Sequence, residues 1–175
     1  RNDDGELGQN NRIQYSSPVQ IPGTNWKYGM GGNDFAVAIR TDGTLWAMGR
    51  SVYGELGQND RTRLSSPVQI PGTTWSNIYP GRYGTLAMKT DGTLWGWGDN
   101  GLGQLGDNSN VKRSSPVQVP GTTWKQVSAC GSGAVMATKT DGTLWGWGLN
   151  NSGELGLGTR VDNEAYSSPI QIPGT

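Results

Sequence analysis

Short runs of alternating apolar and polar residues flank an Asp-Gly pair, and this pattern occurs three times along the chain. The shared segment Thr-Asp-Gly-Thr-Leu-Trp spans residues 41–46, 90–95 and 140–145. A period of two places every second side chain on the same face, which is typical of a half-buried β-strand. An Asp-Gly pair between two such runs predicts a β-hairpin closed by a two-residue turn, with both central residues at positive φ.

Each predicted hairpin lies inside a longer repeat. Equivalent tryptophans are 49 residues apart from Trp46 to Trp95 and 50 residues apart from Trp95 to Trp145. Three other motifs recur in four copies: Gly-Glu/Gln-Leu-Gly from Gly5, Gly54, Gly103 and Gly153, Ser-Ser-Pro from Ser16, Ser65, Ser114 and Ser167, and Pro-Gly-Thr from Pro22, Pro71, Pro120 and Pro173. No helical period is present, and this repeat length fits a four-stranded propeller blade. The predicted repeats span about residues 1–24 (a partial copy), 25–73, 74–122 and 123–175.

Four strands are predicted for each blade. The segment after Trp26, Trp75 or Trp124 gives the first strand, and the Asp-Gly hairpin gives the next two. The Ser-Ser-Pro segment, for example Pro116–Val119, gives a fourth strand at the sheet edge, because proline cannot donate the hydrogen bond that a central strand needs. The predicted fold class is all-β, a β-propeller segment with about three to three and a half blades of a larger ring.

The two halves of the repeat are unequal in number. Four copies of the segment from Gly-Glu/Gln-Leu-Gly to Pro-Gly-Thr alternate with three hairpin segments. Residues 1–24 and 167–175 are therefore predicted to belong to blades whose hairpins are absent. Exposed strand edges pair with other strands or aggregate. We expect further blades of the same chain, or another protein, to cover these ends, so the chain is a piece of a longer propeller or part of an oligomer.

The residue pattern resembles the regulator of chromosome condensation repeat family, in its bacterial-looking form. The resemblance is carried by Asp-Gly-Thr-Leu-Trp-Gly-Trp-Gly at 91–98, Gly-Gln-Leu-Gly at 103–106 and Ser-Ser-Pro-Val-Gln at 114–118, and it covers the whole chain. It implies a seven-bladed propeller. The functions that it implies range from guanine-nucleotide exchange on a small GTPase, through ultraviolet sensing by tryptophan clusters, to inhibition of β-lactamases.

The chain departs from this family in two respects. The histidine that often precedes the strand leading into the hairpin is replaced by Phe35, Gly84 and Ala134. No long insertion resembles the protruding wedge with which exchange factors contact their partner. The resemblance therefore implies the fold and leaves the function open.

Composition argues against several classes of function. The 14 basic and 14 acidic residues give zero formal net charge, so no nucleic-acid partner is expected. No apolar run is long enough to span a membrane. The chain has no histidine and one cysteine, Cys130, so neither an intrachain disulfide nor a histidine-based nucleophilic site is expected. We expect no enzyme activity, no catalytic residue and no cofactor.

Two sets of repeated residues could suggest ligand binding. The tryptophans could stack on sugars or cations, but a side chain repeated at the same blade position is typical of the core between blades. We therefore predict that Trp95 and Trp145 are mostly buried. Asp42, Asp91 and Asp141 lack the clustered Asp-x-Asp spacing of a calcium loop, so the turn explains them and no metal site is expected.

The loop between Gly-Glu/Gln-Leu-Gly and Ser-Ser-Pro is the candidate partner-binding site. It varies between copies, and every copy carries at least one cation. Equivalent loops of a propeller emerge on the same face, so these side chains would form an arc of positive charge on a neutral body. The alternative is that they are ordinary solubilising charges. The predicted partner-binding residues are Arg12, Arg61, Arg63, Lys112, Arg113 and Arg160.

The sequence therefore predicts a non-enzymatic propeller module for protein–protein interaction or structural assembly. Its repeat style predicts an extracellular or virion-associated location. Alternatives from other classes are an inhibitor of an extracellular enzyme, a regulator similar to a guanine-nucleotide exchange factor, and a carbohydrate-binding propeller. Carbohydrate binding would need exposed tryptophans, whereas inhibition would need only loop side chains.

Overall fold

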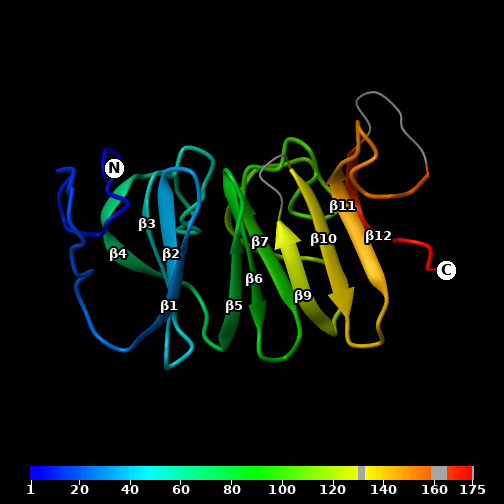
Figure 1. Ribbon diagram of the computed structural model, residues 1–175, viewed down its shortest axis with the longest axis horizontal. Coiled ribbons are helices and arrows are strands. Elements are labelled where there is room, and N and C mark those ends of the chain that lie inside the picture. The colour runs from blue at the N-terminus through cyan, green and yellow to red at the C-terminus, as the bar shows by residue number, and fades with distance from the viewer. Residues whose placement is uncertain (130–132, 159–164, 175) are drawn as a thin grey trace.

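The computed structural model describes residues 1–129, 133–158 and 165–174, and all the regular structure in them is β-strand. Three four-stranded sheets lie side by side as propeller blades (Figure 1). The first blade contains β1 (Trp26–Gly31), β2 (Phe35–Arg40), β3 (Leu45–Gly49) and β4 (Leu64–Ile70). The second contains β5 (Trp75–Pro80), β6 (Gly84–Lys89), β7 (Leu94–Gly98) and β8 (Arg113–Gln118). The third contains β9 (Trp124–Ala129), β10 (Ala134–Lys139), β11 (Leu144–Leu149) and β12 (Ala165–Gln171).

The predicted all-β propeller fold is confirmed. Strands within each blade follow one another antiparallel and in chain order, so β4, β8 and β12 each lie at a sheet edge. These edge strands contain Pro67, Pro116 and Pro169, where a missing N–H removes no interior hydrogen bond of the sheet. Among the residues that the structure describes, no helix could span a membrane.

The prediction that residues 167–175 belong to a blade without its hairpin is wrong. Strand β12 pairs with β11, with Trp145 opposite Gln171 and Gly146 opposite Ile170. The reason is that each Ser-Ser-Pro segment completes the hairpin that precedes it in the chain, so the last copy closes the third blade. Residues 1–24 form no strand, and Figure 1 shows them alongside the first blade.

The Asp-Gly hairpins have three-residue turns, so the predicted two-residue turn is also wrong. In the first blade the Gly43 N–H donates to the Arg40 carbonyl oxygen at 3.0 Å, and the Arg40 N–H donates to the Thr44 carbonyl oxygen at 3.0 Å. Of the turn residues, Gly43 has positive φ, at 78°, and Asp42 does not. A type I turn followed by a left-handed glycine has this pattern.

A series of hydrogen bonds explains why the repeated turn motif extends as far as the tryptophan. Asp42 accepts from the N–H and the hydroxyl of Thr44 at 2.9 and 2.7 Å, and that hydroxyl oxygen accepts from the Trp46 indole N–H at 2.9 Å. These bonds from Thr44 to the ionised carboxylate lower the pKa of Asp42. Residues 91–95 and 141–145 repeat the arrangement. The aspartates are therefore turn residues that help to orient an indole.

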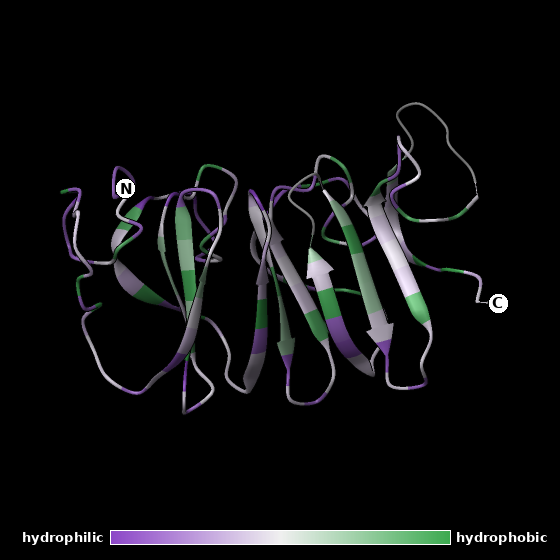
Figure 2. Cartoon of the chain, in the orientation of Figure 1, coloured by the Kyte–Doolittle hydropathy of each residue, from purple (hydrophilic) through white to green (hydrophobic). Residues whose placement is uncertain are grey.

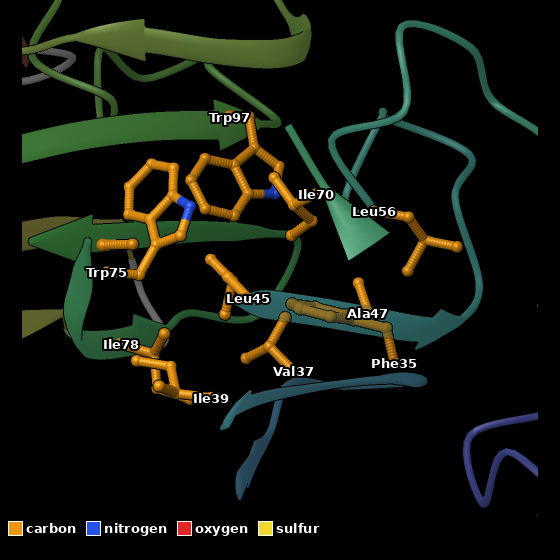
Figure 3. Close-up of a cluster of buried hydrophobic side chains, with 11 residues drawn as sticks. Phe35, Val37, Ile39, Leu45, Ala47, Leu56, Ile70, Trp75, Ile78 and Trp97 are labelled. Carbon is orange, nitrogen blue, oxygen red and sulfur yellow. The ribbon is translucent and has the colours of Figure 1, made fainter. Parts of the chain in front are cut away.

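The core lies between neighbouring blades. Figure 3 shows Val37, Leu45 and Ile70 of the first blade close to Trp75 and Trp97 of the second, and all five side chains are at most 2% exposed. A corresponding cluster joins the second and third blades. Figure 2 shows that hydrophobic positions concentrate on the strands, whereas the connecting loops are largely hydrophilic.

Hydrogen bonds also join each blade to the next. The Trp97 indole N–H donates to the Glu55 carbonyl oxygen at 2.8 Å. Asn59, at φ 62°, donates its N–H to the Ser114 carbonyl oxygen at 2.7 Å, and its side-chain oxygen accepts from the Ser115 hydroxyl at 3.0 Å. Equivalent bonds join Trp147 to Gln104, Asn10 to Ser65 and Ser66, and Asn108 to Ser167 and Ser168. The loop motifs of one repeat thus form hydrogen bonds with the following repeat.

Trp95 and Trp145 are partly buried and pack against the two core clusters, which agrees with the prediction that both are mostly buried. They lie near the turn end of their strands, whereas Trp97 lies two residues further into the blade and is fully buried. Trp95 packs edge-on against Trp75, with 6.4 Å between ring centroids, and the Lys89 ammonium lies 4.3 Å from its ring centroid. This is a cation–π contact within the fold, and a sugar stacking on that face would have to displace the lysine.

We expect Trp97→Ala to destabilise the protein more than Trp95→Ala. Truncating a buried tryptophan costs roughly 3–5 kcal/mol, and Trp97 is fully buried and hydrogen-bonded to the preceding blade. The half-buried Trp95 loses less area, and we expect a cost of about 1–2 kcal/mol. Urea unfolding of both variants measures the difference. Equal losses of unfolding free energy in the two variants would contradict the conclusion that Trp97 contributes more to the core than Trp95.

Candidate functional site

The candidate cations lie in the loops at the end of the blades opposite to the Asp-Gly hairpins, at the top of Figure 1. We call this end the loop face; it comprises the loops between β1 and β2, β3 and β4, β5 and β6, and β7 and β8, together with residues 1–15. Four of the six predicted partner-binding residues are on it, namely Arg12, Arg61, Arg63 and Lys112, and Arg113 directly follows it as the first residue of β8. Arg160 lies outside the described residues, as does Cys130.

Three of these arginines converge. Arg12, Arg61 and Arg63 line one open depression of about 410 Å³, although Arg12 comes from the segment preceding the first blade and the other two come from the β3–β4 loop. Arg63 donates to the Asp4 carboxylate at 2.7 Å. Arg12 and Arg61 are exposed and make no ion pair with any described residue. Two cations therefore remain available to an anionic group from outside.

One residue that lines this depression, Ser51, departs from the repeated pattern. Asn100 holds its loop by donating to the Ser109 and Val111 carbonyl oxygens at 2.8 and 3.2 Å, and its side-chain oxygen accepts from the Leu105 N–H at 2.9 Å. Asn2 does the same in the first copy. Ser51 occupies this position in the β3–β4 loop. Its hydroxyl is buried, has no hydrogen-bond partner among the described residues, and is too short to reach the loop.

Lys112 and Arg113 have partners within their own repeat. Lys112 lies 3.3 Å from the Asp99 carboxylate, and Arg113 donates to the Asp107 carboxylate at 2.7 Å. Burial of Asp107 opposes its ionisation, but hydrogen bonds from Ser109, Arg113 and Asn100 outweigh burial and keep its pKa below the ordinary value. Arg113 therefore helps to fold its loop, whereas the Lys112 ammonium remains on the surface.

Sequence reasoning missed an aromatic cluster on the same face. Tyr53 and Tyr83 meet edge to face across the first and second blades, with 5.3 Å between ring centroids. Arg50 lies 5.8 and 5.7 Å from the two centroids, Arg82 lies 4.9 Å from that of Tyr83, and the Lys112 ammonium lies 4.1 Å from that of Tyr53. Neither tyrosine belongs to a repeated motif, so only their meeting in space reveals the cluster.

A group of carboxylates lies beside the first blade. Oxygens of Asp4, Glu6 and Asp34 lie within 4.8 Å of one another. Arg63 pairs with Asp4, while Arg1 and Arg50 pair with Asp34 at 2.8 and 3.3 Å. Glu6 accepts from the Asp4 N–H at 2.9 Å, which is the contact that Glu55 and Glu154 make in their own loops. These carboxylates therefore take part in loop structure and ion pairs.

Three four-stranded antiparallel sheets that pack face to face through repeated loop motifs define a β-propeller repeat protein. The family model described as regulator of chromosome condensation (RCC1) repeat matches residues 91–138 and 141–175, and a second model of the same repeat matches residues 124–154. Residues 91–175 therefore consist of regulator of chromosome condensation repeats. This confirms the resemblance found in its sequence motifs.

Solved structures agree with this fold. The chain aligns over 99% of its length with human WBSCR16 at 23% identity and a TM-score of 0.82. It aligns over its whole length with Prp20p from Saccharomyces cerevisiae at 19% identity and a TM-score of 0.84, and with yeast RCC1 (Prp20) bound to Kap60 at 20% and 0.84. It covers 47%, 45% and 44% of those chains, so it spans less than half their length. A comparison with curated proteins gave no match.

We expect Ser51→Asn to stabilise the protein. Asparagine at this position could make the loop hydrogen bonds that Asn2 and Asn100 make, and it would fill the space beside the unpaired hydroxyl. One net hydrogen bond contributes about 1 kcal/mol, which thermal unfolding resolves. The matched reverse change, Asn100→Ser, should destabilise by a similar or larger amount. A lower melting temperature for Ser51→Asn would contradict the proposed equivalence of these positions.

Proposed function

We propose that this chain is a non-enzymatic protein-interaction module whose loop face binds an acidic segment of a partner protein. The observation that carries the proposal is the convergence of Arg12, Arg61 and Arg63, from two successive repeats, on one open depression. Arginine forms paired hydrogen bonds with carboxylates and is enriched at the energetic centres of interfaces. The absence of histidine from the sequence agrees with a role in binding rather than catalysis.

Apolar and aromatic side chains on the same face support this proposal. Ile13, Val52 and Val111 are 62%, 45% and 58% exposed, and all three lie in these loops. Tyr53 and Tyr83 add a partly exposed aromatic pair close to Val52. Protein interfaces combine such apolar and tyrosine contacts with arginine. Charges that only keep a protein soluble need no apolar or aromatic side chains beside them.

Solved structures with the same fold are consistent with a role in protein binding. The Prp20p structure was described with its binding to Gsp1p and histones, and the yeast RCC1 (Prp20) structure contains Kap60. We infer no shared partner, because identity is low and the chain covers less than half of those proteins. Inhibition of an extracellular enzyme stays an alternative that would use the same loops. An extracellular or virion-associated location stays a prediction from repeat style.

A labelled octaglutamate peptide provides a probe for the loop face. We expect saturable binding by fluorescence anisotropy that weakens as salt is raised, since exposed charge pairs are screened. Arg12→Ala combined with Arg61→Ala should weaken binding roughly tenfold, which corresponds to about 1.4 kcal/mol. Lys125→Ala provides a matched control, because this exposed cation lies in β9 near the hairpin end. Equal affinity of the double variant and the control would overturn the proposal.

We also propose that a further blade of the same type covers the outer side of the third blade. Leu45 and Leu94 are fully buried by the blade that follows them, whereas the equivalent Leu144 is 36% exposed. A Cβ added to Gly54 would lie 2.5 Å from Ser114, but one added to Gly153 would meet no described atom within 4 Å. The third blade therefore presents the surface with which the earlier blades bind their successors.

The 175-residue chain in isolation tests this second proposal. We expect it to self-associate in sedimentation velocity at micromolar concentration and to bind a hydrophobic dye, because uncovered apolar blade surfaces associate. Leu144→Lys should reduce both effects, whereas Leu102→Lys, at an exposed loop-face leucine, should not. A monomer that unfolds cooperatively and binds no dye would contradict the proposal.

A further inference from the structure

The arginine-lined depression lies where two successive loops meet at the loop face. All the charged residues that line it are arginines, and no carboxylate belongs to the lining. The residues of this lining are Arg12, Ser51, Val52, Arg61, Thr62, Arg63 and Ser65. Its polar groups are therefore guanidinium and hydroxyl groups, which suits an anion with several acceptor oxygens.

Two of these arginines occupy equivalent positions in their loops. Seven residues separate the Gly-Glu/Gln-Leu-Gly motif from Ser-Ser-Pro in each of the first three copies, so these loops align without a gap. In this alignment Arg12, Arg61 and Asn110 correspond. Among these three loops, a pair of arginines from successive copies occurs only where the first loop meets the second. The pair is thus a feature of one junction and is not required by the repeat.

A hydroxyl group also distinguishes the second loop. In the same alignment Thr62 corresponds to Ile13 and Val111, which are 62% and 58% exposed. The Thr62 N–H donates to the Asp60 carboxylate at 2.9 Å, whereas the Thr62 hydroxyl makes no hydrogen bond with any described residue. A threonine in place of an exposed apolar residue therefore adds an unused hydrogen-bond donor to the depression.

Asp4 positions the third arginine. The Arg63 Nε donates to an Asp4 carboxylate oxygen at 2.7 Å, and the Asp4 side chain is only 12% exposed. This bond uses one of the five N–H donors of the guanidinium and leaves those of its two terminal nitrogens. Arg63 is thus held in place by Asp4 while it lines the depression beside the unpaired Arg12 and Arg61.

We propose that this depression binds a phosphorylated serine or threonine side chain of the partner protein. The inference rests on the proposed function and names the chemical group that the arginines recognise. A phosphoryl monoester carries about −1.5 to −2 charges at pH 7 and has three acceptor oxygens. The unpaired guanidinium groups of Arg12 and Arg61 match this charge, and Arg63 and Thr62 add further donors. A carboxylate carries one charge on two oxygens, so it engages fewer of these groups.

Fluorescence anisotropy with two labelled peptides tests this inference on the full chain. The first peptide has phosphoserine between two runs of three glutamates, and the second is octaglutamate. Their charges are nearly equal, since a phosphoryl group replaces about two carboxylates. We expect the phosphopeptide to bind roughly tenfold more tightly, because one group can accept several charge-assisted hydrogen bonds at once. Arg12→Ala combined with Arg61→Ala should remove this preference.

Variants of Thr62 separate recognition of phosphate from general attraction between charges. Thr62→Val removes the hydroxyl and nearly preserves the shape, and it should weaken phosphopeptide binding roughly fivefold, the loss expected for one hydrogen bond. Thr62→Ser, which keeps the hydroxyl, should bind the phosphopeptide as the wild type does. Thr73→Val is a matched control, since Thr73 is exposed in the link between β4 and β5 at the hairpin end, and it should change neither affinity.

The outcomes distinguish this inference from the proposed function. Equal affinity of the wild type for the two peptides would overturn the inference and leave the proposed acidic partner intact. Failure of both peptides to bind would overturn both proposals. Vesicles of phosphatidylcholine with phosphatidic acid present the same phosphoryl chemistry on a membrane. Binding to these vesicles without a preference for the phosphopeptide would also overturn the inference.

Discussion

The structure depends on the close approach of the Gly-Glu/Gln-Leu-Gly turns at Gly5, Gly54 and Gly103 to the blade that follows each of them. A Cβ on Gly54 would lie 2.5 Å from the Ser114 Cα atom, and Gly54 has a φ of 92°. Glycine alone satisfies both conditions without strain. This approach lets Leu56 enter the core and lets the Glu55 carbonyl oxygen accept from the Trp97 indole. The same contacts therefore pack one blade against the next and fix the conformation of the loop, and they recur along the chain.

Because the base of each loop is fixed in this way, the residues beyond it can vary without disturbing the core. The β3–β4 loop is anchored through Asn59, and its remainder carries Arg61 and Arg63 beside Arg12 of the previous copy. A site built from two anchored loops loses less conformational entropy on binding than one built from unrestrained segments. The same loops also present exposed apolar residues, so charge and apolar contact area occur together on one face.

Departures from the repeat are more informative about function than the repeat itself. Ser51 replaces a loop-fixing asparagine. This departure coincides with the depression at the loop face that is lined by Arg12, Arg61 and Arg63. The tryptophans are different. They repeat regularly, and their hydrogen bonds and cation contacts explain them as parts of the fold. In a structure whose local sequence patterns otherwise agree with the fold, functional sites are expected at the positions where a residue breaks the repeated pattern.

The sequence by itself determined the all-β class, the number of blades and the proline-containing edge strands, because these follow from alternation and from chemistry within a few residues. It did not determine the turn type, since Asp-Gly fits both a two-residue turn and a three-residue turn with a left-handed glycine. Only the tertiary structure decided that β12 completes the third blade, that Trp97 rather than Trp95 is fully buried, and that Arg12 meets Arg61. The Tyr53–Tyr83 contact likewise exists only between blades. Each depends on contacts between segments that are distant in the sequence, and most of these form only when one repeat packs against the next.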